Sequence, residues 1–157
     1  MAIAGLPLLL PLVTPPAGAA TAADFQAVLD ALARAWSRQD TRGALELFTE
    51  DALYMQPPDL QLYRGREELA KLFGALRPGT LMTFHHVALD AKAQVGFGEF
   101  SSGHAGAARA DHGVVVVGLR DGRIASWREY FQDGPSSFDD FTRVEGKAWK
   151  FTAKDLE

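Results

Sequence analysis

The chain has 157 residues, of which 47% are hydrophobic and 23% are charged, a balance typical of one soluble globular domain. The net charge of −4 gives no basic excess, so a nucleic-acid partner is not expected. Cysteine is absent, which excludes disulfides, thiolate zinc sites and a cysteine nucleophile.

The first twenty residues differ from the rest of the chain. Leu6 to Val13 is a short apolar run interrupted by prolines, and an Ala-Gly-Ala-Ala sequence follows it. An apolar run before small residues is typical of a secretory signal, but no basic residue precedes Arg34. The run is also too short to cross a bilayer, so no membrane span is expected. We predict that residues 1–20 are an arm or a signal remnant, and both a cytoplasmic and an exported location stay open.

Three helices are predicted in the first half of the chain. Thr21 and Asp24 have the spacing of a capping box, and an amphipathic helix after them should extend to about Gln39. Asp40 is a suitable N-cap for a second, shorter helix, and a third is predicted over 67–76. The apolar stripe of the first helix consists of Phe25, Val28, Leu29, Leu32, Ala33 and Trp36.

Strands dominate the second half. A short strand is predicted over 52–56, and longer strands over 81–89 and 94–101 precede a final hairpin. Helices followed by strands predict an α+β domain over 21–135. Its expected form is a cone-shaped fold of about three N-terminal helices packed on a strongly bent, mostly antiparallel sheet. Residues 136–157 are predicted to form a C-terminal extension.

The clearest local signal is Asp121-Gly122 between two β-rich runs, which is typical of a type I′ hairpin. An uninterrupted register from this turn places a carboxylate and an imidazole on one face, among apolar and aromatic side chains. That predicted face carries His112, Val114, Val116, Trp127, Glu129 and Phe131. The opposite face carries Gly113, Val115, Val117, Leu119, Ile124, Ser126, Arg128 and Tyr130.

Glu129 is the main candidate for acid–base chemistry. A carboxyl group in an apolar cone is desolvated, which raises its pKa towards the range useful for a general base or acid. His112 is predicted to be its diagonal neighbour and to relay a proton. In the alternative reading, Glu129 pairs with Arg109 or Arg128 near the strand end, and His112 is a structural imidazole.

Other residues are predicted to bind the substrate. Tyr54 and Gln56 share one face of the predicted short strand and suit hydrogen bonding to a carbonyl or hydroxyl group. Trp36 and Trp127 are expected to form cavity wall. Val114, Val116 and Phe131 complete the predicted lining.

No metal or cofactor is expected. His85 and His86 are adjacent in a strand, so they are predicted to face opposite ways and not to share an ion. Asp111 is predicted to point away from the face that carries His112. The sequence contains no His-x-x-x-His motif, nucleotide-binding loop or Gly-x-Ser-x-Gly elbow.

Three segments together resemble the SnoaL-like branch of the nuclear transport factor two superfamily. They are Leu47 to Pro58, Tyr63 to Leu69 and Asp121 to Phe131, and their order and spacing agree with the family over about residues 22 to 133. The resemblance implies a cone of three helices and a strongly bent sheet, usually as a dimer. The superfamily includes isomerases, cyclases, epoxide hydrolases and non-enzymatic association domains, so this fold does not name a reaction.

The steroid isomerases of this superfamily are a poor match in their catalytic residues. Alignment implies that their general-base aspartate falls on Gln56, their oxyanion-hole tyrosine on Leu32 and their second aspartate on Val114. Classical steroid isomerisation is therefore not expected. The polyketide cyclases resemble this chain in having an acidic residue on the last strand, where Glu129 stands.

Two functions follow from these observations. The first is a small-molecule-binding, cofactor-independent enzyme of the isomerase, cyclase or hydratase type, acting on an apolar, oxygen-bearing substrate. The second is a non-catalytic ligand-binding or dimerisation module, because an apolar outward strand face is expected to be covered by a second subunit. The residues predicted for that outward face include Val115, Val117, Ile124 and Tyr130.

Overall fold

The computed structural model describes residues 18–58 and 60–143. Most of the predicted N-terminal arm and the end of the C-terminal extension lie outside the described residues. The helices are α1 (Ala22–Arg38), α2 (Thr41–Glu46), α3 (Gly65–Gly74) and α4 (Phe138–Thr142). The strands are β1 (Phe48–Gln56), β2 (Gln61–Arg64), β3 (Thr80–Asp90), β4 (Val95–His104), β5 (Arg109–Arg120) and β6 (Arg123–Pro135).

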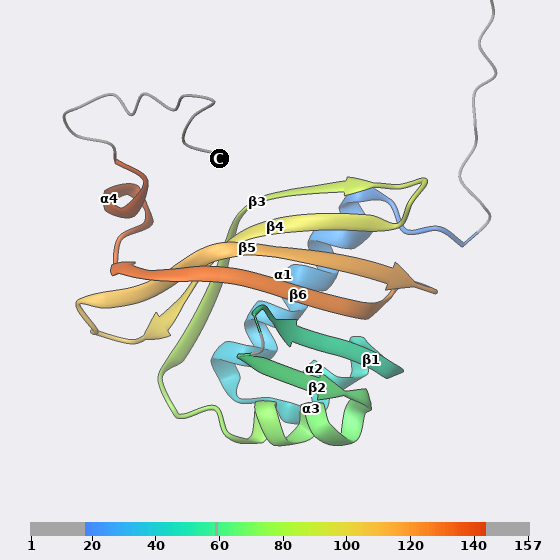
Figure 1. The fold of residues 1–157 in the computed structure, drawn as a ribbon, viewed down its shortest axis with the longest axis horizontal. Helices are drawn as coiled ribbons and strands as arrows, with labels where there is room; N and C mark the ends of the chain where they lie inside the picture. Colours follow the sequence, from blue (N-terminus) through green and yellow to red (C-terminus); the bar gives the residue numbers. More distant parts are fainter. Residues whose placement is uncertain (1–17, 59, 144–157) are drawn as a thin grey trace, which may run out of the picture.

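The six strands form one sheet in the order β2-β1-β6-β5-β4-β3, with α1 behind it and α3 below it in Figure 1. Every neighbouring pair is antiparallel except β1 and β6, which run parallel. The domain is α+β as predicted, with a mixed sheet. The prediction of three N-terminal helices holds in part, because α2 has only 6 residues and two strands precede α3.

The predicted caps of the first two helices are confirmed. The Thr21 side chain accepts from the backbone N–H of Asp24, and the Asp24 carboxylate accepts from the backbone N–H of Thr21. Gln39 ends α1 in the left-handed conformation, at a φ of 53°. Asp40 then caps α2 by accepting from Gly43 N at 2.9 Å.

Glycines in β4 let α1 lie close against the sheet. A Cβ on Gly96 would stand 2.6 Å from the Phe25 ring, and a Cβ on Gly98 would stand 3.0 Å from Leu29 Cδ1. Phe25 and Leu29 are both fully buried. We call the sheet face under α1 and α3 the helix-covered face and the other the open face.

The β5–β6 hairpin contains a β-bulge that the sequence prediction missed. The turn itself is as predicted, with positive φ at both Asp121 and Gly122. Ile124 pairs with Leu119 as expected, but the next pair joins Gly118 to Ser126. One extra residue on β6 is therefore left without a partner of its own, and every later pair is shifted by one.

This extra residue is Ala125. Because of it, the β5 side chains that were predicted to share a face with Trp127 and Glu129 lie on the opposite face of the sheet. Glu129 pairs with Val115, and Trp127 pairs with Val117. Val115 and Val117 are therefore core residues on the helix-covered face, each with 0% of its surface exposed.

The predicted lining positions of Val114 and Val116 are wrong for the same reason. Both side chains lie on the open face, and Val114 is 37% exposed. Placing Val115, Val117 and Ile124 on the outward surface is also wrong, since all three are fully buried. A slip of one residue exchanges the two faces of a strand.

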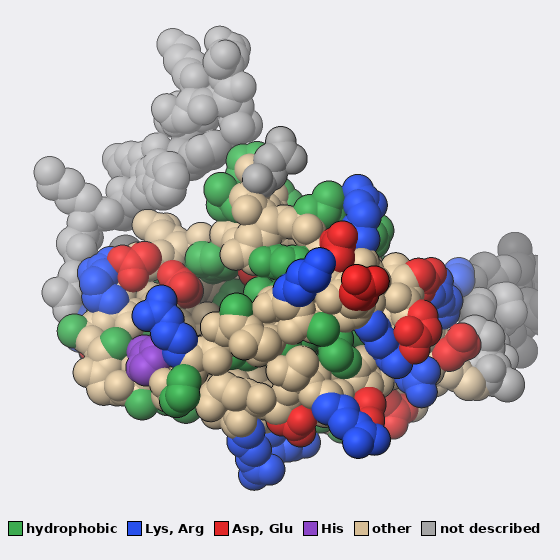
Figure 2. All heavy atoms as spheres, turned by 90° about the horizontal axis from the view of Figure 1, so that it is seen from below, with side chains coloured by type: hydrophobic (Ala, Val, Ile, Leu, Met, Phe, Trp, Pro, Cys, Tyr) green, Lys and Arg blue, Asp and Glu red, His purple; other side chains and the backbone are tan. Residues whose placement is uncertain are grey.

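Two surface properties bear on the predicted partners. No helix in the described part of the chain is long and apolar enough to cross a membrane. On the side of the described residues that Figure 2 shows, basic and acidic side chains are interspersed, without one extended basic area.

Candidate functional site

Glu129 is a buried carboxylate held by two neutral donors. It is 5% exposed. Its Oε2 accepts from the Tyr54 hydroxyl at 2.8 Å and from Trp127 Nε1 at 2.9 Å. Oε1 accepts no hydrogen bond from the residues that the structure describes. One carboxylate oxygen is thus fixed, and the other has no hydrogen-bond donor in the part of the chain that the structure describes.

The environment of Glu129 raises its pKa above the ordinary value of a glutamic acid. Burial is the largest cause, because it disfavours the charged form. The hydrogen bonds from Trp127 and Tyr54 act in the opposite direction, and burial outweighs them. The predicted alternative of an ion pair with Arg109 is wrong, since Arg109 pairs with Asp133. A carboxyl group with a raised pKa suits general acid or base chemistry.

The parallel pairing of β1 with β6 brings the predicted residues together. Tyr54 lies opposite Trp127, and their rings stack with centroids 5.8 Å apart and planes 12° apart. The last pair of this ladder joins Met55 to Arg128, so the same register places Gln56 beside Glu129. Gln56 is 8% exposed. The structure therefore groups four of the predicted site residues.

Aromatic side chains surround this group. Phe84 meets Trp127 edge to face at 6.3 Å between ring centroids. Phe131 lies two residues beyond Glu129 on the same face and packs against Phe100 at 6.5 Å. Phe131 is 38% exposed whereas Phe100 is buried. The carboxylate thus has an apolar, largely aromatic surrounding.

His112 does not belong to this cluster. It lies on the open face, where its Nδ1 is 2.7 Å from Ser101 Oγ and its Nε2 is 2.6 Å from the Pro135 carbonyl oxygen. Phe141 of α4 stacks on it at 4.4 Å. The predicted pair with Glu129 is wrong because the bulge turns His112 to the other side of the sheet.

Asp111 takes the place on the helix-covered face that His112 was expected to hold. It pairs with Asp133 across β6. It lines a hollow of about 430 Å³ together with Trp36, Thr80 and His104. Burial and the nearby Asp133 charge raise the pKa of Asp111. Sequence reasoning missed this residue only because it used the uninterrupted register.

Trp36 also lines this hollow, which Glu129 does not line, so its expected place in the wall of a substrate cavity stays a prediction. Its Nε1 is buried and has no hydrogen-bond partner among the described residues. Its ring meets Phe73 edge to face, with centroids 5.9 Å apart.

The two adjacent histidines are also not where the sequence predicted them. A register shift between Phe84 and His86 turns both imidazoles to the open face. His86 Nδ1 lies 2.8 Å from Glu99 Oε2, and His85 Nε2 lies 2.7 Å from Ser101 Oγ. Among the described residues, no group of three or more histidine, aspartate and glutamate side chains is placed to hold a metal ion.

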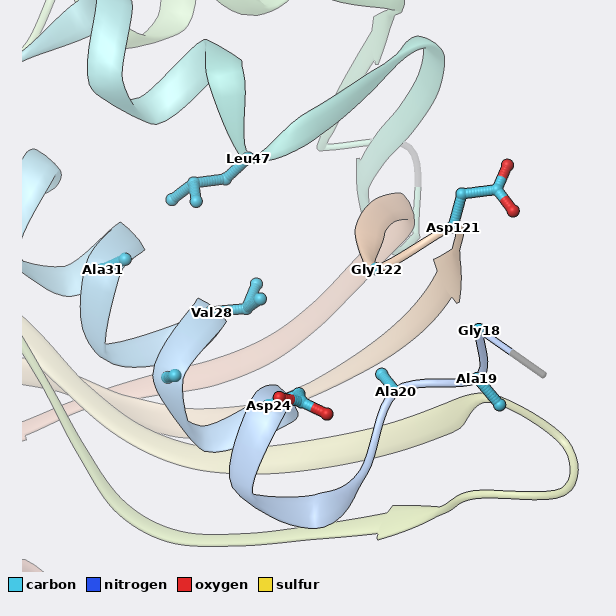
Figure 3. Close-up of a pocket in the computed structure, with 10 residues that line it drawn as sticks. Gly18, Ala19, Ala20, Asp24, Val28, Ala31, Leu47, Asp121 and Gly122 are labelled. Carbon is cyan, nitrogen blue, oxygen red and sulfur yellow. The ribbon is translucent and has the colours of Figure 1, made fainter. Parts of the chain in front are cut away.

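A further hollow of about 590 Å³ lies at the other end of α1 (Figure 3). Val28 and Ala31 of α1, Leu47 and the turn residue Gly122 line it. Asp24 and Asp121 are the acidic groups at its edge. No residue of the Glu129 cluster lines this hollow, so it contributes nothing to the chemistry of that carboxylate.

Comparison with known proteins identifies the family. The family model described as SnoaL-like domain matches residues 28–127. The chain belongs to the SnoaL-like family. No curated protein matches it.

Solved structures show the same fold as this SnoaL-like protein. An NTF-2 like protein of unknown function from Burkholderia xenovorans LB400 is 16% identical, with a TM-score of 0.62 over 80% of this chain and 97% of that one. An LEH-like epoxide hydrolase from M. tuberculosis is 19% identical, with a TM-score of 0.60 over 71% and 84%. The epoxide hydrolase/cyclase-like enzyme SalBIII is 16% identical, with a TM-score of 0.61 over 70% and 94%. At these identities the likeness extends to the fold alone.

The Tyr54 hydroxyl should stabilise the SnoaL-like domain through Glu129. Replacing Tyr54 by phenylalanine removes one of the two hydrogen bonds to Oε2. We expect a loss of roughly 1–3 kcal/mol in the free energy of unfolding and a further rise in the pKa of Glu129. Urea unfolding at pH 7 measures the loss. Tyr63→Phe is the control, because the Tyr63 ring contacts Tyr54 but makes no hydrogen bond with Glu129. Equal losses in the two variants would contradict this role.

Proposed function

We propose that this SnoaL-like protein is a cofactor-independent acid–base enzyme of the isomerase, cyclase or hydratase type. Its substrate is an apolar small molecule that carries a carbonyl, hydroxyl or epoxide oxygen. The observation that carries the proposal is the buried Glu129, with Oε2 held by Tyr54 and Trp127 and Oε1 without a donor among the described residues.

In this proposal Glu129 moves the proton. Oε1 takes it either from a carbon next to a carbonyl group or from a water molecule that attacks the substrate. Tyr54 and Trp127 keep the carboxylate in a fixed orientation throughout. The Gln56 amide lies beside it and donates to the developing oxygen anion. Phe131 and its aromatic neighbours contact the apolar part of the substrate.

The solved relatives support this class of chemistry. The M. tuberculosis protein is described as an epoxide hydrolase, and SalBIII as an epoxide hydrolase/cyclase-like enzyme acting in pyran ring formation. Epoxide opening by water and ring closure onto an epoxide both need a proton to be removed from the attacking oxygen. A desolvated carboxylate such as Glu129 is suited to that step.

Turnover of two probe classes tests the proposal. Cyclohexene oxide and 1-indanone are incubated with the full chain in D₂O. Mass spectrometry then follows diol formation from the first and deuterium uptake by the second. The wild type is expected to accelerate at least one reaction, and Glu129→Gln to lose that acceleration. Glu99→Gln is the matched control, because Glu99 is a glutamate on the open face paired with His86.

Native mass spectrometry also identifies any ligands that the protein retains through purification. If neither these ligands nor the two probes are turned over, the proposal that the protein is an enzyme is overturned. This result would favour the second function, a non-catalytic ligand-binding module. Equal rates for Glu129→Gln and the wild type would remove Glu129 from the mechanism.

We also propose that the protein forms a homodimer through the open face. Apolar side chains cross three neighbouring strands there, and a patch of this kind on a soluble domain usually marks an interface. Phe97 is 48% exposed, Val114 37% and Tyr130 49%. Phe97 pairs with Val116, and Val114 pairs with Tyr130, so the patch is continuous.

A single charge on this face should dissociate the dimer. Val114→Asp places a carboxylate in the middle of the patch, and we expect a monomer by sedimentation velocity, whereas the wild type sediments as a dimer. Leu60→Asp is the control, since Leu60 is a 64% exposed apolar residue in the connection between β1 and β2, outside the sheet. A monomeric wild type would contradict the proposed dimer.

A further inference from the structure

Three polar side chains on the open face form a continuous hydrogen-bonded row that the proposed chemistry does not use. They come from the neighbouring strands β3, β4 and β5. His85 Nε2 lies 2.7 Å from Ser101 Oγ, and Ser101 Oγ lies 2.7 Å from His112 Nδ1. His112 Nε2 lies 2.6 Å from the Pro135 carbonyl oxygen.

The direction of these hydrogen bonds follows from the last one. A carbonyl oxygen only accepts, so His112 Nε2 carries a proton and donates it to Pro135. In the neutral imidazole, Nδ1 is then an acceptor, and the Ser101 hydroxyl donates to it. His85 Nε2 donates in turn to Ser101 Oγ. The serine proton thus points at a base whose other nitrogen is anchored by the backbone.

This is the arrangement of an activated serine. A nucleophile, a base within hydrogen-bond distance and a third group that orients the base are the parts that covalent catalysis requires. His112 is 1% exposed and cannot turn away, because Phe141 stacks on it at 4.4 Å. His85 is stacked under Phe138 at 3.7 Å. Helix α4 therefore holds both imidazoles in place.

The serine also borders a hollow where a substrate can lie. The hollow has a volume of about 390 Å³, and its lining includes Leu81, Thr83, Arg109 and Ser136 besides Ser101 itself. Ser101 is partly exposed, and Leu81 is 47% exposed. The hollow therefore offers an apolar contact, and the guanidinium of Arg109, which is paired with Asp133, also lines it.

We propose that Ser101 is the nucleophile of a second site, which accepts small acyl esters, with His112 as its general base. The site lies at the α4 end of the open face, where Ser101 pairs with His112, outside the apolar patch of the proposed dimer. Ser101 Oγ bonds to the acyl carbon while its proton passes to His112 Nδ1. The ester C–O bond breaks, and the departing alcohol receives that proton. Water then attacks the acyl-serine with the same base, which releases the acid and restores the hydroxyl.

Labelling by diisopropyl fluorophosphate tests the site, because the serine displaces fluoride and retains the phosphoryl group. The full chain is treated with the reagent and the modified residue is located by peptide mass spectrometry. We expect one label per chain, on Ser101. Ser101→Ala should abolish it. Ser126→Ala should leave it unchanged, since Ser126 is a serine of the same open face and has no hydrogen bond with a histidine among the described residues.

The role of His112 is tested in the same assay. His112→Asn should slow labelling by roughly 10²–10⁴-fold, the usual contribution of a general base, in a protein whose circular dichroism is that of the wild type. If this variant does not fold, urea-denatured wild type replaces it, and labelling of Ser101 should vanish there. The proposal would be overturned if the folded protein is not labelled or is labelled on another residue. It would also be overturned if Ser101 is labelled at the wild-type rate in His112→Asn or in the urea-denatured protein.

Discussion

Replacing Glu129 by glutamine should stabilise the folded protein at pH 7 and slow its turnover by roughly 10²–10⁴-fold. Burial makes the charged carboxylate less favourable in the folded chain than in the unfolded one, which is why its pKa is raised. Each pKa unit of that rise costs about 1.4 kcal/mol once the group is charged in both states. The glutamine oxygen still accepts from Tyr54 and Trp127, so the two hydrogen bonds are kept.

The sign of the pH dependence follows from the direction of the shift. Below the ordinary glutamic acid pKa, Glu129 is protonated in both states and its charge costs nothing. As pH rises from there through the raised pKa of the folded state, the unfolded chain loses its proton first, and stability is lost. The advantage of Glu129→Gln should therefore grow across this window and stay constant above it.

Urea unfolding of the wild type and Glu129→Gln between about pH 4 and pH 8 measures this difference, with linear extrapolation to water. Glu99→Gln serves as the control, because Glu99 lies at the surface and its charge is not removed from water to a comparable degree. A Glu129→Gln protein that is less stable at pH 7, or a difference that does not change with pH, would contradict the prediction. A stability gain together with a loss of turnover is expected where a buried group serves function.

Deleting Ala125 should abolish cooperative folding. The bulge at this residue is what allows Ile124 and Trp127 to be buried at the same time, each at 0% exposure. Without it, a regular hairpin places one of these two side chains on the open face. Losing the burial of the tryptophan alone should lower the free energy of unfolding by roughly 3–5 kcal/mol, as truncating a buried tryptophan does. This is a large part of the stability of a domain of this size.

Circular dichroism during thermal unfolding measures the outcome, and we expect no sharp transition for the Ala125 deletion. The control is deletion of Ala107, which lies exposed in the connection between β4 and β5 and should retain a cooperative transition. A well-folded Ala125 deletion would show that the bulge does not fix the two faces of the hairpin.

Much of the domain could be predicted from the sequence because the signals are local. The capping residues Thr21 and Asp40 and the Asp121-Gly122 turn act within a few residues, and all three are confirmed. The shared face of Tyr54 and Gln56 needs only the alternation of a strand, and both are buried.

The bulges could not be predicted in the same way. Neither glycine nor proline marks Ala125, and the residues around it alternate acceptably in either register. Because of the one unpaired residue in β6, Asp111 lies on the helix-covered face, where the sequence predicted His112. The shift at His85 similarly turned two adjacent imidazoles to one side.

Long-range pairing was the other missing information. The parallel contact of β1 with β6 brings Tyr54 to Glu129 across 75 positions of the chain, and no local pattern encodes it. The contact of Phe141 with His112 likewise depends on where α4 returns to the sheet. Glu129 could therefore be proposed from the sequence as the acid–base residue. Its hydrogen-bond partners could not be predicted, and neither could the position of His112 on the opposite face of the sheet.

The state of the Glu129 carboxyl group tests the central claim most directly. The ¹³C chemical shift of its side-chain carboxyl carbon is followed by NMR against pH, and the resonance is assigned by its loss in Glu129→Gln. We predict a titration midpoint above the ordinary value of 4.5, moving higher still in Tyr54→Phe. A midpoint at or below that value would contradict the account, because the group would then be a solvated or ion-paired carboxylate without a raised pKa.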